Sequence, residues 1–170
     1  MYMAKLKTKQ KVMLIVFAGV IVTMLMLALF GFFVYLIFFH ADYGRVYNHY
    51  VTYQDEYYSL EVTVEQIKYD EENGSAHIWI KDPWKDYFFV CPQTCQILAD
   101  SDFFDVVTED TVITIYSHPY VAWDGWISPV VGVTVGDKVY VDFETGKQNW
   151  LDTLKQWSDE VGFLQTPIKG

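Results

Sequence analysis

Cys91 and Cys95 are the residues whose type and spacing point most directly to chemistry. They are the only cysteines in the sequence, with three residues between them. In an oxidising compartment, two thiols this close in sequence are expected to pair, although so short a loop adds only about 2 kcal/mol to the free energy of unfolding. A redox-active pair instead has a Cys-x-x-Cys spacing at a helix N-terminus. We therefore predict a structural disulfide between Cys91 and Cys95.

The four histidines do not follow a metal-binding or catalytic spacing. His40 and His49 are nine residues apart, which is not a chelating interval on one helix, so both are expected to be interfacial polar residues. His77 falls on a predicted strand and His118 at the start of a loop, with no evident nucleophile nearby. We expect both to lie at the surface.

Carboxylates are abundant but form no recognisable site. The acidic stretches at residues 70–74 and 100–110 have the oxygen-rich composition that calcium needs, yet neither follows the EF-hand pattern. Phosphate-binding loops and Gly-x-Ser-x-Gly elbows do not occur in the sequence. The sequence therefore predicts no catalytic residue, no metal and no cofactor, and leaves open a hydrolase with an unfamiliar motif.

Large aromatic residues in two predicted loops are the remaining indication of a binding surface. If exposed, such side chains stack on a sugar or anchor a protein partner. If turned inwards, they plug the ends of the fold, and both interpretations stay open. The candidate binding residues are Trp84, Tyr120, Trp123, Trp126, Asp82, Asp86 and Asp124.

The chain that must position these residues begins with a membrane-spanning pattern. Residues 12–39 contain no formal charge, and about 20 apolar residues suffice to cross a bilayer as a helix. A cleavable signal peptide has an apolar core of only about 7–15 residues and a small-x-small cleavage site, and an uncleaved anchor fits better. Four lysines precede the span within residues 1–11, and only Arg45 follows closely. The charge bias predicts a single-pass protein of the cell membrane, with a short basic cytoplasmic leader and the rest extracytoplasmic.

Charge in the predicted extracytoplasmic part is strongly negative. The residues after the span hold eight Lys and Arg against 22 Asp and Glu, a net charge of −14. Such a surface disfavours nucleic acid, whose phosphates need basic partners. A basic peptide, a basic protein or a divalent cation remains compatible, although net charge alone does not identify a ligand.

Residues 40–58 differ in composition from both the apolar span and the β-patterned residues beyond Tyr58. They are rich in tyrosine, whose apolar ring and polar tip suit the headgroup layer. Helical spacing recurs at Tyr43, Tyr47, Tyr50, Gln54 and Tyr57. We therefore predict an interfacial stalk in which the membrane helix continues outward.

Residues 59–146 carry the alternating patterns of a β domain. A phase slip at Glu65-Gln66 indicates a bulge, and Asn73-Gly74 and Gly136-Asp137 suit hairpin turns. A short helix is expected at residues 99–107. The predicted strands cover residues 60–69, 75–81, 87–91, 111–117, 127–135 and 138–143.

The C-terminal residues 147–170 are predicted to form a helix and a tail. Apolar residues step by three and four from Trp150 to Leu164, which predicts an amphipathic helix over residues 149–161, and Gly162 and Pro167 indicate a frayed end. The order of the predicted elements, three strands followed by a helix and further strands, resembles that of the small barrel of the oligonucleotide/oligosaccharide-binding (OB) fold. We predict such a barrel of about six antiparallel strands, with an SH3-like barrel or an open sheet covered by the last helix as alternatives.

Three functions are compatible with this organisation. The first is a non-enzymatic, membrane-anchored interaction domain that binds a protein or an envelope component such as a glycan. The second is an accessory subunit of a larger membrane complex that acts through its span, where Gly19 and Thr23 offer a small-residue face. The third is the unrecognised hydrolase. We predict the first, with oligomeric state left open.

Overall fold

The computed structural model describes residues 8–38, 41–83, 85–118, 120–122, 125–162 and 165–169. The chain divides into two compact units, Met1–His40 and Ala41–Gly170. The first unit contains helix α1 (Thr8–Phe38), and the second contains every other element. The boundary follows the change from an uncharged apolar sequence to a tyrosine-rich and then acidic one.

Helix α1 has the length and composition of a membrane-spanning segment. Its apolar stretch Gln10–Leu36 is long enough to cross a bilayer, and its most apolar window is entirely unburied by the rest of the protein. Membrane anchors and signal sequences both have this character. The hydroxyl of Thr23 donates a hydrogen bond to the Gly19 carbonyl oxygen at 2.9 Å, which satisfies this polar group within the helix.

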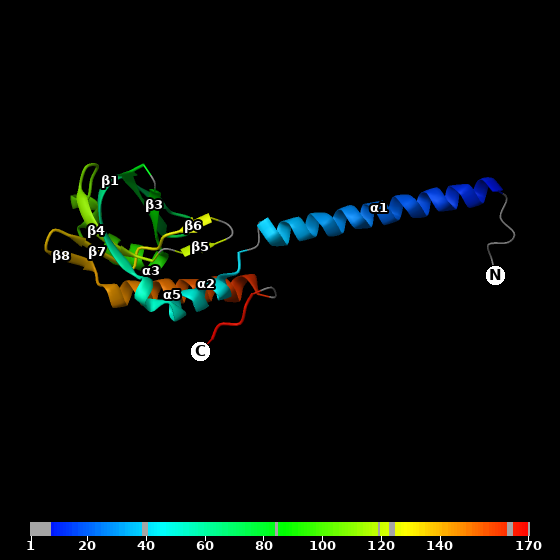
Figure 1. Cartoon of the computed structure of the whole chain (residues 1–170). Helices are drawn as coiled ribbons and strands as arrows, with labels where there is room; N and C mark the ends of the chain where they lie inside the picture. Colours follow the sequence, from blue (N-terminus) through cyan, green and yellow to red (C-terminus); the bar gives the residue numbers. More distant parts are fainter. Residues whose placement is uncertain are drawn as a thin grey trace. The chain divides into compact units, whose positions relative to one another are not determined.

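The second unit is built on a six-stranded antiparallel sheet (Figure 1) with the strand order β3-β2-β1-β4-β7-β8. A separate two-stranded hairpin pairs β5 with β6. The strands are β1 (Tyr58–Asp70), β2 (Ser75–Asp82), β3 (Lys85–Val90), β4 (Val112–Ser117), β5 (Tyr120–Ala122), β6 (Gly125–Ile127), β7 (Gly132–Val135) and β8 (Lys138–Val141).

The sheet is open, so the predicted closed barrel is wrong and the alternative of an open sheet with a C-terminal helix is correct. The edge strands β3 and β8 do not pair with each other. An isolated bridge between Phe89 and Pro129 joins β3 to the segment before β7. Helices α3 (Pro92–Ala99) and α4 (Phe103–Val106) bury Leu98 and Phe103 in the core on one face of the sheet. They fill space that a closed barrel would enclose.

Local turn and bulge predictions are confirmed. The pairing of β1 with β2 shifts register between Val64 and Gln66, so Glu65 is the extra residue of a bulge. Gly136 has a φ of +57° in the two-residue turn between β7 and β8. The predicted strand at residues 127–135 instead divides into β6 and β7.

The helices differ from the sequence prediction in their limits. The expected helix at residues 99–107 is replaced by α3 and α4, and α3 begins at Pro92, a residue favoured in the first helical turn. The C-terminal helix α5 (Phe143–Val161) begins earlier than expected, because the Asp142 carboxylate caps it by accepting a hydrogen bond from the Thr145 N–H at 3.0 Å.

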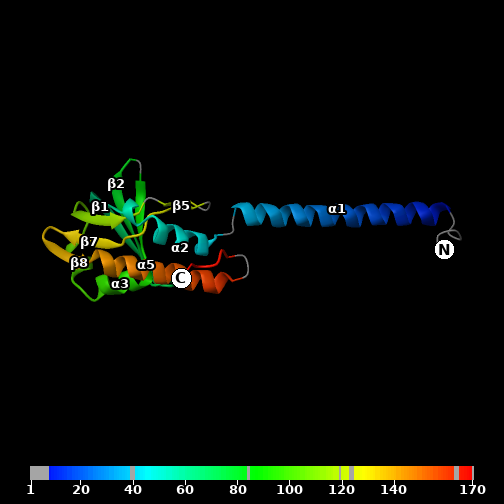
Figure 2. The same cartoon turned by 60° about the horizontal axis from the view of Figure 1, so that its bottom comes forward.

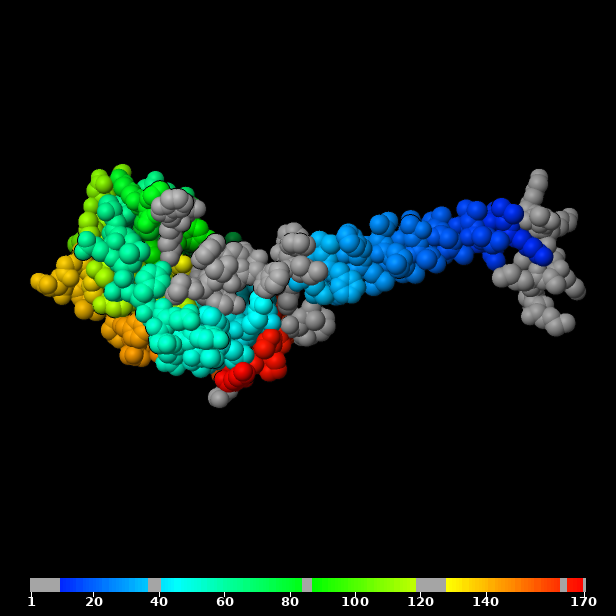
Figure 3. Space-filling model, viewed as in Figure 1, coloured from blue at the N-terminus to red at the C-terminus, as the bar shows by residue number. Residues whose placement is uncertain are grey.

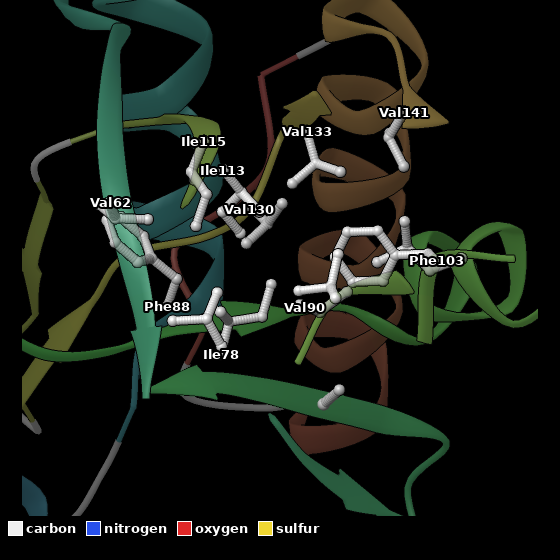
Figure 4. Packing of buried hydrophobic residues seen from close by; sticks show 14 of the residues in the cluster. Val62, Ile78, Phe88, Val90, Phe103, Ile113, Ile115, Val130, Val133 and Val141 are labelled. Atoms are coloured by element: carbon white, nitrogen blue, oxygen red, sulfur yellow. The ribbon is translucent and has the colours of Figure 1, made fainter. Parts of the chain in front are cut away.

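The two faces of the sheet carry different cores. Alternate residues of a strand point to opposite faces, so Phe88 and Phe89 on β3 enter different clusters. The aliphatic core on one face is mostly valine and isoleucine, and Figure 4 shows these side chains pointing toward one another. The aromatic layer packs α2 (Tyr43–Thr52) and α5 on the other face; its buried residues are Val46, Tyr50, Cys91, Val131, Trp150, Leu151 and Leu154.

Residues 43–52 form part of the folded unit rather than a continuation of α1. α2 begins with its own cap, the Asp42 carboxylate, and lies alongside α5 (Figure 2). Between α2 and β1 lies the short 3-10 helix η2 (Gln54–Glu56). The predicted outward extension of the apolar helix is therefore replaced by a separate helix, although the tyrosine spacing did indicate helical structure.

The C-terminal segment is fastened to α2, so the prediction of a frayed end is wrong for residues 165–169. Figure 3 shows this segment, in red, against the cyan residues of α2. Thr166 donates to the Asp42 carboxylate from both its backbone N–H and its hydroxyl, at 3.0 and 2.6 Å. Asn48 donates to the Pro167 carbonyl oxygen at 2.9 Å. Gly44 is required here, because a Cβ would overlap the Thr166 carbonyl oxygen.

Candidate functional site

The predicted aromatic-loop patch lies largely outside the described residues. This applies to Trp84, Trp123 and Asp124, and to the side chains of Asp86, Tyr120 and Trp126. The backbone places Tyr120 on β5 and Trp126 on β6, which are paired with each other. Asp82 is exposed at the end of β2. The patch therefore stays a prediction.

The predicted disulfide is wrong, because Cys91 and Cys95 are both free and buried. α3 begins between them, so Cys91 faces the aromatic layer whereas Cys95 enters the aliphatic core. The Cys91 thiol donates to the Thr94 hydroxyl oxygen, with 3.3 Å between sulfur and oxygen. Burial, with a smaller contribution from Cys91, raises the pKa of Cys95 to about 11. Thiols in such surroundings are unreactive.

An open cleft of about 540 Å³ lies between the β1–β2 turn and α5. We call it the acidic cleft. The turn contributes Asp70 and Glu72, and α5 contributes Glu160. Its other lining residues are Asn73, Ser75, His77, Phe89, Pro92, Thr153, Gln156 and Trp157. Among these described lining residues there is no lysine or arginine, so the negative charge is not neutralised within the cleft.

The β1–β2 turn is held in place by one of the cleft carboxylates. Asp70 accepts hydrogen bonds from the side-chain amide of Asn73 at 2.8 Å and the backbone N–H of Glu72 at 3.1 Å. These bonds, the one from Asn73 above all, lower the pKa of Asp70, so it is ionised at neutral pH. The carboxylates of Glu72 and Glu160 both belong to exposed residues at the rim. Gln156 donates to Glu160 at 2.8 Å.

Half-buried aromatic rings line the acidic cleft. Phe89 and Trp157 have ring centroids 5.9 Å apart, and the His77 ring lies 5.5 Å from that of Phe89. Burial lowers the pKa of His77, outweighing the opposing effect of Asp70, so the imidazole is neutral at pH 7. Aromatic faces beside carboxylates suit an ammonium or guanidinium group, which gains from both the ring quadrupole and the negative charge.

The other acidic stretches are engaged in contacts within the protein. Lys81 bridges Glu109 and Asp110 at 3.0 and 2.8 Å, and Lys138 pairs with Asp102. Three of the five carboxylates in residues 100–110 therefore already have a cationic partner, which makes this stretch less suited to calcium. A second cavity of about 500 Å³ beside this region is mainly apolar, with Ile67, Phe104 and Val107 among its lining residues.

One metal-capable group exists among the described residues, and sequence reasoning missed it. His49, Glu56 and His118 place ligand atoms within 4.8 Å of one another. His118 is fully buried, so its predicted surface position is wrong. No local spacing could have indicated this group, because His118 lies far along the chain from the other two. Rings of the aromatic layer connect it to the cleft through Tyr50, Trp150 and Phe89.

Comparisons of the chain with protein-family models, curated proteins and solved structures find no match.

Proposed function

We propose that this chain is a single-pass, membrane-anchored interaction domain without catalytic activity, which binds a cationic group of a protein or cell-envelope component in its acidic cleft. The observation that carries the proposal is the cleft itself, which is lined by Asp70, Glu72 and Glu160 together with the rings of Phe89 and Trp157. A lysine or arginine side chain, or a primary amine of an envelope polymer, has the charge and size to enter it.

The anchored topology rests on the first unit and on charge. Four lysines precede the apolar stretch of residues 12–39, two of them within the first turn of α1, and the acidic residues all follow α1. By the positive-inside rule this favours a cytoplasmic N-terminus and an extracytoplasmic second unit. A negative field of this strength around the second unit would draw a basic partner toward the cleft and keep anionic ones away.

The test is a titration of the full-length chain in detergent micelles with a lysine-rich octapeptide. The cleft variant is Glu72→Gln with Glu160→Gln. The matched control is Glu61→Gln with Glu65→Gln, which removes the same charge from exposed positions on β1 outside the cleft. We expect the cleft variant to weaken binding at least tenfold in calorimetry and the control less than twofold. Acetylating the peptide amines should abolish binding.

Equal weakening in both double variants would show attraction by net charge alone and would reject the cleft as the binding site. The accessory-subunit alternative is tested with a foreign apolar span in place of residues 12–38. Cross-linking in intact membranes should then retain the partner, whereas loss of the partner would assign recognition to α1.

A hydrolase is the second candidate, because the cleft brings neutral His77 near Ser75 and carboxylates. Binding is favoured over hydrolysis since no hydrogen bond among the described residues joins His77 to Ser75 or to Asp70, as an activated nucleophile requires. His77→Gln separates the two functions. Because the imidazole carries no charge, the substitution should weaken peptide binding by no more than about twofold, whereas hydrolysis of an ester or amide substrate would be lost.

A further inference from the structure

We propose that His49, Glu56 and His118 form a binding site for one divalent transition-metal ion, with Zn²⁺ as the best-fitting ion. The three residues come from separate elements: His49 from α2, Glu56 from η2, and His118 from the residue after β4. The His49 Nε2 and Glu56 Oε2 atoms are 3.9 Å apart. Two imidazoles and one carboxylate are a donor set that zinc uses with a water as fourth ligand.

His118 carries the strongest indication of a ligand. Its Nε2 lies 3.0 Å from the Tyr53 carbonyl oxygen, and since a carbonyl only accepts, Nε2 must carry the proton and donate it. Nδ1 then presents a lone pair. This atom is buried and has no hydrogen-bond partner among the described residues. A buried acceptor without a partner is costly, and a metal ion coordinated by this nitrogen would satisfy it.

The contact with Tyr53 also matches the usual environment of a metal-bound histidine. Ligating imidazoles donate their second N–H to a carbonyl or carboxylate, which fixes the ring orientation and the tautomer. The ring of His118 is further held between those of Tyr50 and Tyr57, with centroids 4.6 and 4.7 Å away. Such packing keeps the ligand atom in position before the metal arrives.

The second histidine and the carboxylate are suitably placed and charged. The rings of His49 and His118 are nearly perpendicular, with centroids 5.2 Å apart. Burial lowers the pKa of both histidines, which keeps them neutral, as metal ligands must be. Tetrahedral zinc places ligand atoms about 3.4 Å apart, so the cluster must contract slightly. Glu56 can supply that movement, because its side chain is 45% exposed.

Bound metal would join α2 and η2 to the end of β4. Imidazole nitrogen favours zinc, cobalt, nickel and copper over calcium and magnesium, which prefer oxygen. The site is separate from the acidic cleft, so its test does not depend on the proposed function.

The experiment uses the full-length chain without an affinity tag, in detergent micelles and stripped with a chelator. Calorimetry with Zn²⁺ should give one equivalent of tight binding, and Co²⁺ should produce the visible absorption bands of a low-coordinate nitrogen and oxygen site. Ca²⁺ and Mg²⁺ should not compete. Zn²⁺ should also raise the melting temperature, because it binds only the folded state.

Variants locate the ion. His49→Gln and Glu56→Gln should each weaken Zn²⁺ binding at least tenfold and alter the Co²⁺ spectrum. Glu56 is exposed and His49 is partly exposed, and circular dichroism checks that each variant keeps the fold. His118→Gln should abolish binding. His77→Gln is the control and should have no effect. Unchanged Zn²⁺ affinity in His49→Gln or Glu56→Gln, loss of affinity in His77→Gln, or the absence of a one-to-one complex would each overturn the proposal.

Discussion

The aliphatic core and the aromatic layer occupy opposite faces of the same sheet, yet they differ in almost every physical respect. The aliphatic core is mostly valine and isoleucine, joined by Phe88, Phe103 and Cys95, and none of its buried side chains carries an oxygen or nitrogen atom. The aromatic layer contains rings with hydroxyl and indole groups, and those of Tyr57 and Trp150 are buried without a hydrogen-bond partner among the described residues.

This difference suggests that the aliphatic core mainly stabilises the fold, whereas the aromatic layer supplies the proposed binding sites. Branched aliphatic residues pack densely and fix one arrangement of the sheet. Unsatisfied buried polar groups reduce stability, and they are tolerated where a ligand or a partner can satisfy them. Both proposed sites draw on the aromatic layer: Phe89 and Trp157 line the acidic cleft, and Tyr50 and Tyr57 enclose His118.

The strongest test compares two neighbours on β3 that face opposite ways. Phe88 is fully buried in the aliphatic core, whereas Phe89 is only partly buried and lines the acidic cleft. Phe88→Ala should lower the free energy of unfolding by about 3–5 kcal/mol, through lost burial and a cavity. Phe89→Ala should cost clearly less, but should weaken the lysine-peptide complex. Urea unfolding and calorimetry measure the two effects, and equal stability losses would contradict the division between faces.

The next largest effect is expected where α5 meets the sheet. Gly146 lies so close to the residues before β7 that a Cβ would overlap the Val131 carbonyl oxygen. Alanine is favoured over glycine inside a helix by about 1 kcal/mol, but overlap with backbone costs about 1–3 kcal/mol. Gly146→Ala should therefore be net destabilising in urea unfolding. Lys155→Ala, at an exposed position of the same helix, is the control. A stabilised Gly146→Ala variant would show that α5 does not lie this close to the backbone of Val131.

Local patterns predicted the aliphatic core better than the aromatic layer. Ile113 and Ile115 alternate along one strand, and their burial follows from a period of two that is visible in any short window. The bulge at Glu65 is likewise a local phase slip. Closure of the sheet could not be predicted in the same way. Open sheets and closed barrels can share the same order of elements along the chain. Whether this sheet closes depends on α3 and α4, which fill the space on one of its faces.

The candidate sites depend on contacts that sequence spacing does not contain. His118 meets His49 only because β4 ends beside α2, and Phe89 was one residue in an apolar run with no sign of facing a cleft. The cysteine spacing was compatible with a disulfide. What separated the thiols is the start of α3 at Pro92, which directs them into different clusters.

The two thiols allow the opening of each face to be measured separately. Cys91 belongs to the aromatic layer and Cys95 to the aliphatic core. In the Cys95→Ala variant, alkylation of Cys91 measures how often the aromatic layer opens. In the Cys91→Ser variant, alkylation of Cys95 measures how often the aliphatic core opens. We expect native alkylation of Cys95 to be at least tenfold slower, because burial raises its pKa and because the aliphatic core opens less often. Unfolded chains, in which the rates should be similar, provide the control. Faster labelling of Cys95 would reverse the proposed ranking of the two faces.

The smallest effect concerns one hydroxyl in the aromatic layer. The Tyr57 hydroxyl is buried and has no hydrogen-bond partner among the described residues, and burial raises the pKa of Tyr57 so that it stays neutral. Tyr57→Phe should leave stability unchanged or raise it by up to about 1 kcal/mol, because it removes an unsatisfied group and keeps the ring. Tyr140 is the matched control beside the aliphatic core. Its hydroxyl interacts with the Asp102 carboxylate and lowers the pKa of that group, so Tyr140→Phe should cost about 0.5–1 kcal/mol. If Tyr57→Phe is instead the more destabilising change, the hydroxyl is satisfied, and polar groups in the aromatic layer are structural rather than available to a ligand.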